Sequence, residues 1–330
     1  MKNRMMILAA ALLAAISCNK EFGESYKTAD DEKVEVGVLL DIPETKATNI
    51  VDDNEKKVNS VQIYVFRDNG ELESYDRSND GNITLSVTKG NKDFYALVNA
   101  PAHEYDTKEA LLAGISYLTN NKLSSFEMVG SEHINITKNQ DIEIVVKRLV
   151  AKVELQKISR EFISASQGAV EMSIDAIYLT NVAGDTEYQE DTSKIKSSPS
   201  IWLNKMGYES SEADALLYDG PFTHTLADKA EYSVKHSFYP YRNPTEANAD
   251  GGEWSPRHTK LVIRTTYGGK VKYYPIVLPK IERNKKYVIT DLILTRPGSD
   301  SEDIPVSAAD CQFSIKVDEW EDGKTYTETI

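Results

Sequence analysis

The sequence is dominated by short segments in which apolar and polar side chains alternate. In KVEVGVLLDI, residues 33–42, the apolar side chains occupy every second position. They are Val34, Val36, Val38, Leu40 and Ile42. A period of two is typical of a β-strand with one buried face. The pattern predicts a strand that ends before Pro43, which cannot donate a backbone hydrogen bond.

Many later segments share this pattern, and turn residues separate them. Asn69-Gly70 predicts one hairpin and Gly268-Gly269 another. Short strands in this number, with few helices, favour a mainly β fold of two tandem antiparallel β-sandwiches. The predicted strands are 59–66, 81–88, 92–100, 133–137, 141–148, 149–158, 169–182, 231–242, 259–269, 270–278, 286–295 and 311–317.

One helix is predicted in each half of the chain. The first runs from Asp106 to Leu118, where Asp106 and Glu109 resemble a capping box. Its apolar side chains share one face, at Leu111, Leu112, Ile115 and Leu118. The second is a short helix in SEADALLY, residues 211–218.

The length and charge of the chain limit its partners. With 330 residues the chain is long enough for two domains that each bury a core. Its formal net charge is -14, which repels phosphate backbones, and no basic cluster interleaved with aromatics offsets this charge. A nucleic-acid partner is therefore not expected, and the charge is explained by solubility.

The first eighteen residues have the features of a signal peptide. Lys2 and Arg4 precede an apolar stretch that is too short to span a bilayer. The segment ends in Ala15-Ile16-Ser17-Cys18, which resembles a lipobox and predicts lipidation at Cys18; the alternative is an ordinary signal peptide that contains a cysteine. If Cys18 carries lipid, Cys311 is the only thiol left and no intramolecular disulfide can form. Residues 19–32 are polar and predict a tether.

A short polar run follows the first predicted strand. Lys46 lies between Glu44-Thr45 and Ala47-Thr48, in a context that suits a trypsin-like protease. Two interpretations are open. Residues 33–43 are either a strand that proteolysis removes, or a permanent edge strand beside an ordinary loop lysine.

Sequence motifs for catalysis or metal binding are weak. The histidines include no i, i+4 pair, which argues against zinc; they are His103, His133, His224, His236 and His258. Asp76, Ser78, Asp80 and Gly81 begin like a calcium loop, but Val87 occupies the position that requires a bidentate Glu. We expect a polar loop there.

Enzyme motifs are equally weak. No nucleophile elbow, P-loop or dinucleotide-binding glycine motif occurs. No carboxylate pair stands out for glycoside hydrolysis. Tyr239, Tyr241 and Trp254 could stack on a sugar, although tyrosines beside strands are more often core residues. We expect no cofactor, no metal and no enzymatic activity.

Several segments form a set with a recognisable order and spacing. They are the lipobox at Cys18, ETKA around Lys46, the strand and turn of 58–75, RLVAKVEL at 148–155, SFYPYRNP at 237–244, the Arg283-Asn284 pair and FSIKVDEW with Trp320. Together they resemble the fimbrillin family, the FimA/Mfa-like subunits of type V pili, and the resemblance covers nearly the whole chain.

The resemblance implies two transthyretin-like sandwich domains, exported as an outer-membrane lipoprotein and matured into an extracellular fimbrium. The implied organisation is a signal peptide (1–18), a tether and removable strand (19–46), an N-terminal domain (47–148) and a C-terminal domain (149–330). A trypsin-like surface protease would cut between Lys46 and Ala47. A strand from another subunit would then fill the vacated groove, head to tail. Other pilus subunits, and a host or glycan receptor, are the implied partners.

The carboxyl-terminal residues depart from the expected donor strand. Residues 321–330, EDGKTYTETI, present no face as apolar as the strand to be replaced. A tip subunit that accepts a strand without donating one is therefore an alternative to a stalk subunit. A permanently anchored lipoprotein, which binds glycan or host protein and is never cut, is the alternative in another class. A hydrolase that uses an acidic pair is the third.

Overall fold

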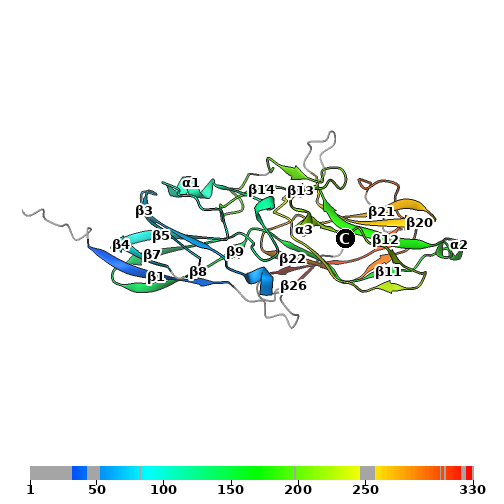
Figure 1. The fold of residues 1–330 in the computed structure, drawn as a ribbon, viewed down its shortest axis with the longest axis horizontal. Coiled ribbons are helices and arrows are strands. Elements are labelled where there is room, and N and C mark those ends of the chain that lie inside the picture. The colour runs from blue at the N-terminus through cyan, green and yellow to red at the C-terminus, as the bar shows by residue number, and fades with distance from the viewer. Residues whose placement is uncertain are drawn as a thin grey trace, which may run out of the picture.

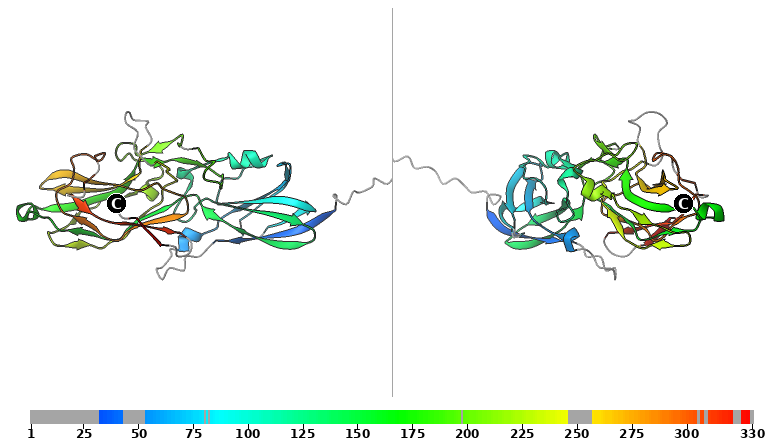
Figure 2. Two further views of the ribbon diagram at one scale, coloured as in Figure 1. Left: turned by 180° about the vertical axis from the view of Figure 1, so that it is seen from behind. Right: turned by 45° about the vertical axis from the view of Figure 1, so that its right-hand side comes forward.

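The computed structural model describes residues 32–42, 53–79, 81, 83–196, 198–245, 257–304, 306–307, 310–320 and 325–328. The molecule is elongated; most strands up to β9 lie toward one end, and most of those from β10 onward lie toward the other (Figure 1). Viewed from behind, the two groups of sheets lie end to end (Figure 2). The fold is mainly β, as the alternating sequence predicts. No helix in the described ranges is long and apolar enough to cross a membrane.

The N-terminal group consists of two sheets packed face to face. Three strands form one sheet in the order β4-β1-β8 and five form the other in the order β3-β2-β5-β7-β9. Inward side chains of both sheets make one buried apolar cluster, which includes Val36, Ile63, Leu85 and Ile144. The strands are β1 (Lys33–Asp41), β2 (Val61–Arg67), β3 (Leu72–Ser78), β4 (Ile83–Thr88), β5 (Gly90–Val98), β7 (Met128–Ile136), β8 (Gln140–Val145) and β9 (Lys147–Arg148).

The C-terminal group is also built from facing sheets. One layer holds β16-β12-β20-β21, with β17 also paired to β12. The facing strands have the orders β19-β10-β22-β25-β26 and β18-β11-β23-β24. These strands are β10 (Lys152–Leu155), β11 (Ile158–Arg160), β12 (Met172–Thr180), β16 (Tyr218–Asp219), β17 (His224–Thr225), β18 (Glu231–Tyr232), β19 (His236–Phe238), β20 (Lys260–Tyr267), β21 (Lys270–Val277), β22 (Lys285–Ile289), β23 (Leu292–Leu294), β24 (Cys311–Gln312), β25 (Ile315–Glu319) and β26 (Thr325–Glu328).

The remaining elements are short. The strand β6 (Ile115–Tyr117) pairs with β14 (Asp185–Glu187), and β13 (Val182–Ala183) pairs with β15 (Trp202–Leu203). The helices are η2 (Asp53–Lys56), α1 (Lys108–Leu112), η3 (Leu118–Asn120), α2 (Ala165–Gly168) and α3 (Asp214–Leu217). One buried apolar cluster continues across the predicted border at 148/149, because it contains both Phe126 and Tyr239. The division into two domains therefore stays a prediction.

The predicted helix from Asp106 to Leu118 is wrong in extent and in its cap. Only Lys108–Leu112 is helical, and the Thr107 hydroxyl accepts from the Ala110 amide at 3.1 Å. The chain leaves the helix at Gly114, where a Cβ would crowd the Tyr105 ring. Ile115 then enters β6, so strand pairing with β14 outweighs the helical pattern. The second predicted helix, in 211–218, is present as the shorter α3.

Both predicted hairpins are confirmed, whereas several long predicted strands divide in two. Antiparallel β2 and β3 flank Asn69-Gly70, and β20 and β21 flank Gly268-Gly269. The predicted strand 286–295 splits into β22 and β23, which belong to different sheets. The segments 149–158, 231–242 and 311–317 divide similarly. A period of two cannot reveal such a break, because alternation continues through it.

Candidate functional site

The strand β1 lies in the middle of its sheet. It pairs antiparallel with β4 and parallel with β8, for example through Val36, which lies opposite Leu85 on one side and Gln140 on the other. The interpretation of residues 33–43 as an edge strand is therefore wrong. Removing β1 would leave two unpaired strand edges facing each other across a groove.

The inward side chains of β1 belong to the N-terminal core. Val34, Val36 and Val38 are all buried, and Val36 is 0% exposed. Full burial of such a side chain contributes about 1.5 to 3 kcal/mol. Leu40 and Ile42 pack against the same cluster but are only partly buried. Leu40 and Ile42 therefore each contribute less to stability than a fully buried side chain.

Both ends of β1 are fixed by further contacts. The Glu35 amide donates to Asn139 Oδ1 at 3.1 Å, and the Val146 amide donates to the Asp41 carbonyl at 2.9 Å. Before the strand, Lys89 and Glu32 form an ion pair at 2.6 Å. The strand is thus held by its backbone along both sides and by its valines from within.

The predicted processing residues lie outside the described residues. This holds for Cys18, and for Lys46 and Ala47. The chain is described up to Ile42 and again from Asp53, where η2 begins.

The segment after the predicted cut is attached to the C-terminal group through Glu55. This side chain is 2% exposed, and its Oε1 accepts from Lys152 Nζ and from the Tyr239 hydroxyl, each at 2.5 Å. The Arg148 Nε donates to the Glu55 carbonyl at 2.9 Å. No sequence pattern predicts the role of Glu55, because it is a single glutamate in a polar run.

Residues from three of the family-like segments meet beside Glu55. The Arg148 guanidinium lies over the Trp320 ring, 4.6 Å from its centroid. The Arg148 amide donates to Asn284 Oδ1 at 3.3 Å, and the Trp320 amide donates to the Asn284 carbonyl at 3.0 Å. These segments, far apart in sequence, thus build one junction between the two groups of sheets.

Arg283, the neighbour of Asn284, reaches a different strand. Its guanidinium donates to the carbonyls of Gln189 and Glu187, at 2.8 and 3.0 Å. Burial, followed by repulsion from Arg242, lowers the Arg283 pKa to about 10. It remains a cation at neutral pH and holds the β14 region against the C-terminal group.

The tyrosines considered as sugar platforms are core residues. Tyr239 and Tyr241 are 4% and 0% exposed. The Tyr241 hydroxyl lies 2.5 Å from Ser116 Oγ and accepts from Asn121 Nδ2 at 2.7 Å. Trp254 lies outside the described residues. The core interpretation of the two tyrosines is confirmed.

No cluster of metal-ligating side chains occurs in the described ranges. Of the calcium-like residues, Asp76 is in β3 and its Oδ1 accepts from the Arg77 amide, while Asp80 lies outside the description. Cys311 is a buried free thiol, and burial raises its pKa to about 12. It is therefore protonated and unreactive at neutral pH.

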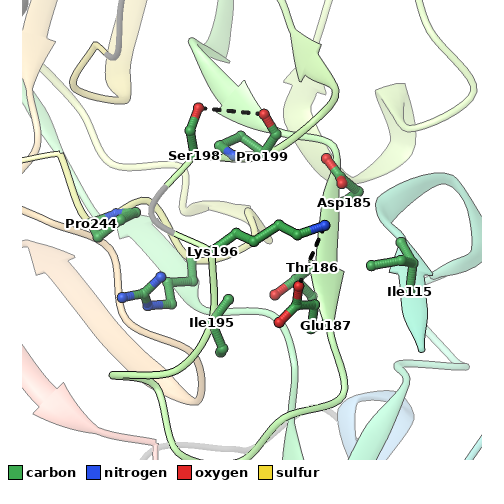
Figure 3. A pocket seen from close by; sticks show the side chains of 10 residues that line it. Ile115, Asp185, Thr186, Glu187, Ile195, Lys196, Ser198, Pro199 and Pro244 are labelled. Atoms are coloured by element: carbon green, nitrogen blue, oxygen red, sulfur yellow. Dashed lines mark hydrogen bonds and ion pairs between the residues drawn. The ribbon is translucent and has the colours of Figure 1, made fainter. Parts of the chain in front are cut away.

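Figure 3 shows a small pocket beside β14. Lys196 extends across it toward Glu187, with Nζ 3.7 Å from Oε1, and Asp185, Arg242 and Pro244 also line it. Its volume of about 20 Å³ has room for a single water molecule. A second hollow of about 420 Å³ is open to solvent between the β2–β3 turn and α1, where Lys108 is paired with Asp93 at 2.9 Å. Neither hollow brings together groups that indicate a particular ligand.

Two layers of β-strands, with the first strand inserted at the centre of its sheet, define a β-sandwich protein in which β1 completes the N-terminal core. Comparison with known proteins finds a family model that matches part of the chain. The model of the family described as major fimbrial subunit protein (FimA) matches residues 40–143. A search of curated proteins by sequence found no match.

Solved structures extend the likeness to most of the chain. A protein assigned to cell adhesion from Bacteroides eggerthii aligns with a TM-score of 0.67 and 17% identity, covering 88% of this chain and 96% of that one. The fimbrilin FimA of Porphyromonas gingivalis gives 0.63 and 14%, with 87% and 98% covered. The tip fimbrial protein Mfa3 of the same organism gives 0.52 and 14%, with 88% and 100% covered. At these identities the likeness establishes the fold, and the resemblance to the FimA/Mfa-like fimbrillins is confirmed.

Proposed function

We propose that this chain is a structural and adhesive subunit of a type V fimbrium. In this proposal it is exported as a lipoprotein precursor with lipid on Cys18, and a trypsin-like protease cuts it between Lys46 and Ala47. The strand β1 then leaves, and a strand of another subunit fills the groove between β4 and β8. The protein has no enzymatic role.

The central position of β1 is the observation that carries this proposal. A strand that pairs on both sides and inserts three buried valines leaves, once removed, a groove that only another apolar strand can fill. The FimA family model matches residues 40–143, which include β4 and the first part of β8 beside the groove, and this match supports the same function. Because the groove and a donated strand belong to different parts of a subunit, repeated exchange builds an open filament unless it closes into a ring.

The anchoring of Glu55 supports release of β1 at its carboxyl end. After a cut at Lys46, the residues from Asp53 onward stay attached through Glu55, Lys152 and Tyr239. The amino-terminal fragment is then held only by contacts within the N-terminal group, which are the pairing with β4 and β8, the buried valines and the Lys89–Glu32 ion pair. The fragment becomes exchangeable while the new amino terminus stays near the junction.

Limited trypsin digestion of the precursor from residue 19 tests the proposal, followed by intact mass and size-exclusion chromatography. We expect one early cut after Lys46, followed by departure of the 19–46 fragment when excess competing peptide of sequence 33–42 is added. Lys46→Gln is the control and should prevent both. If Lys46 resists cleavage while other loops are cut, the chain functions uncut and the anchored-lipoprotein alternative replaces this proposal.

A further inference from the structure

The outward face of β1 fits its neighbour β8 less well than the inward face fits the core. Along β8, the outward residues Gly37 and Leu39 lie opposite Asp141 and Glu143. The next outward residue, Asp41, lies opposite Val145, which follows Glu143 by two positions on β8. None of the β1 residues that face β8 on this side is basic.

Asp141 occupies the space above Gly37. A Cβ added at Gly37 would overlap Asp141 Oδ1 and would lie 3.3 Å from Cγ. A larger residue at this position would force the exposed carboxylate into another rotamer, at a modest cost. The groove therefore discriminates between side chains at one register position of whatever strand fills it.

Glu143 lies beside an exposed leucine. Leu39 is 58% exposed and so gains little from burial. No ion pair between described residues involves Asp41, Asp141 or Glu143. Carboxylates on adjacent strands of one face repel each other, whereas a basic side chain there would pair with them.

We propose that Asp141 and Glu143 select the strand that replaces β1. They favour a small residue at the position of Gly37 and basic residues at those of Leu39 and Asp41. This inference rests on the proposed function, because it concerns the same groove. According to this proposal, β1 does not have the highest possible affinity for the groove. Its valines fill the core, but a strand with basic outward residues would bind more tightly.

The chain's own carboxyl-terminal segment does not meet these requirements. If Gly323 took the place of Gly37, Asp322 and Lys324 would fall at the inward positions of Val36 and Val38. Burying either charge without a partner is strongly unfavourable. The occupant we assign is therefore a basic, alternating strand of a different subunit.

Peptide competition on the trypsin-cut precursor, after trypsin has been inhibited, tests this selection. The probes are a labelled peptide of sequence 33–42 and variants of it that carry Leu39→Lys with Asp41→Lys, Gly37→Ala, or Glu35→Lys. Each exposed ion pair changes affinity a few-fold, so we expect the double-lysine peptide to bind roughly five- to tenfold more tightly than the parent peptide. The Glu35→Lys peptide is the control for added positive charge, with a change of +2 against +3 for the double-lysine peptide, because position 35 has no paired residue on β8. It should gain much less.

Variants of the cut protein show which carboxylate causes each difference in peptide affinity. Glu143→Gln should remove most of the double-lysine advantage, and Asp141→Ala should remove the penalty of the Gly37→Ala peptide. The inference is overturned if these advantages persist in both variants, or if all peptides bind equally, although the proposed groove would then still stand. If no peptide enters the cut protein, the proposed function fails and this inference fails with it.

A measurement on the uncut precursor is independent of cleavage. Leu39→Lys should raise the midpoint of denaturant unfolding in the parent protein, and it should not do so in the Glu143→Gln background. An equal effect of Leu39→Lys in both backgrounds would show that Glu143 does not interact with the side chain at position 39. That result would overturn this part of the proposal.

Discussion

At the scale of single residues, the junction beside Glu55 shows what sequence patterns can and cannot reveal. Arg148, Asn284 and Trp320 were all within family-like segments, and the structure brings them into contact. Their partner Glu55 was missed, because its burial depends on Lys152 and Tyr239, which approach from distant strands. Local alternation predicts which face of a strand is buried, but it contains no information about such long-range polar contacts.

The Glu55 contacts predict a large loss of stability on truncation. Glu55→Ala leaves Lys152 and the Tyr239 hydroxyl without their buried acceptor, so the free energy of unfolding should fall by about 3 kcal/mol. Denaturant unfolding at pH 7 measures this change. Glu132→Ala, on an exposed part of β7, is the control and should change stability by less than about 0.5 kcal/mol. Equal unfolding midpoints for the two variants would contradict the structural role of Glu55.

Glu73 predicts a specific acid sensitivity of the N-terminal group. Burial alone would raise its pKa, but hydrogen bonds from the Thr88 amide and from Lys92 outweigh burial and lower the pKa below the ordinary 4.5. A lowered pKa contributes stability above pH 4.5 that is lost as the pH falls through the folded-state value. The stability difference between the parent and Glu73→Gln should therefore be largest near neutral pH and shrink below about pH 4.5.

Urea unfolding from pH 7 to pH 3 measures this dependence. Glu132→Gln removes one exposed carboxylate from β7 and serves as the control. A Glu73→Gln difference that stays constant over this range would show that the Thr88 and Lys92 contacts do not favour the ionised carboxylate.

At the scale of elements, β1 follows its sequence pattern closely. Its alternation predicted one buried face, and Val34, Val36 and Val38 are buried. The pattern did not reveal that β1 is central, because edge and central strands of a one-sided sheet alternate alike. The helix prediction failed for the opposite reason. Its apolar spacing was helical, but Ile115 is used by β6, whose pairing with β14 spans some seventy positions of sequence.

The two faces of β1 predict opposite tolerance to charge. Val36→Asp places a carboxylate in the core and should reduce the free energy of unfolding of the precursor by more than about 3 kcal/mol. Leu39→Asp, three residues away on the exposed face, should cost less than about 1 kcal/mol. Thermal or denaturant unfolding distinguishes them. In trypsin-cut protein Val36→Asp should also speed loss of the 19–46 fragment, and similar fragment lifetimes for the two variants would contradict core insertion of β1.

At the scale of the whole molecule, net charge opposes association of identical copies. Each chain carries a formal charge of -14, so two copies repel over distances that salt shortens, with a Debye length of about 10 Å at 0.1 M. Added salt should weaken binding of the proposed basic donor strand, because it screens the attraction of that strand to Asp141 and Glu143. By contrast, added salt should favour association of identical copies. The sign of the salt dependence therefore separates the two kinds of assembly.

We expect binding of the double-lysine peptide to the cut protein to weaken as salt rises from 0.05 to about 0.5 M, with association of cut copies changing in the reverse direction. Fluorescence anisotropy measures the first and light scattering the second, and the unmodified peptide of sequence 33–42 is the control for loss of apolar binding. If salt strengthens binding of both peptides equally, apolar burial by the valines alone decides which strand enters. The carboxylates of β8 would then play no part in the selection, and a neutral strand with an equally apolar inward face would be as suitable a donor as a basic one.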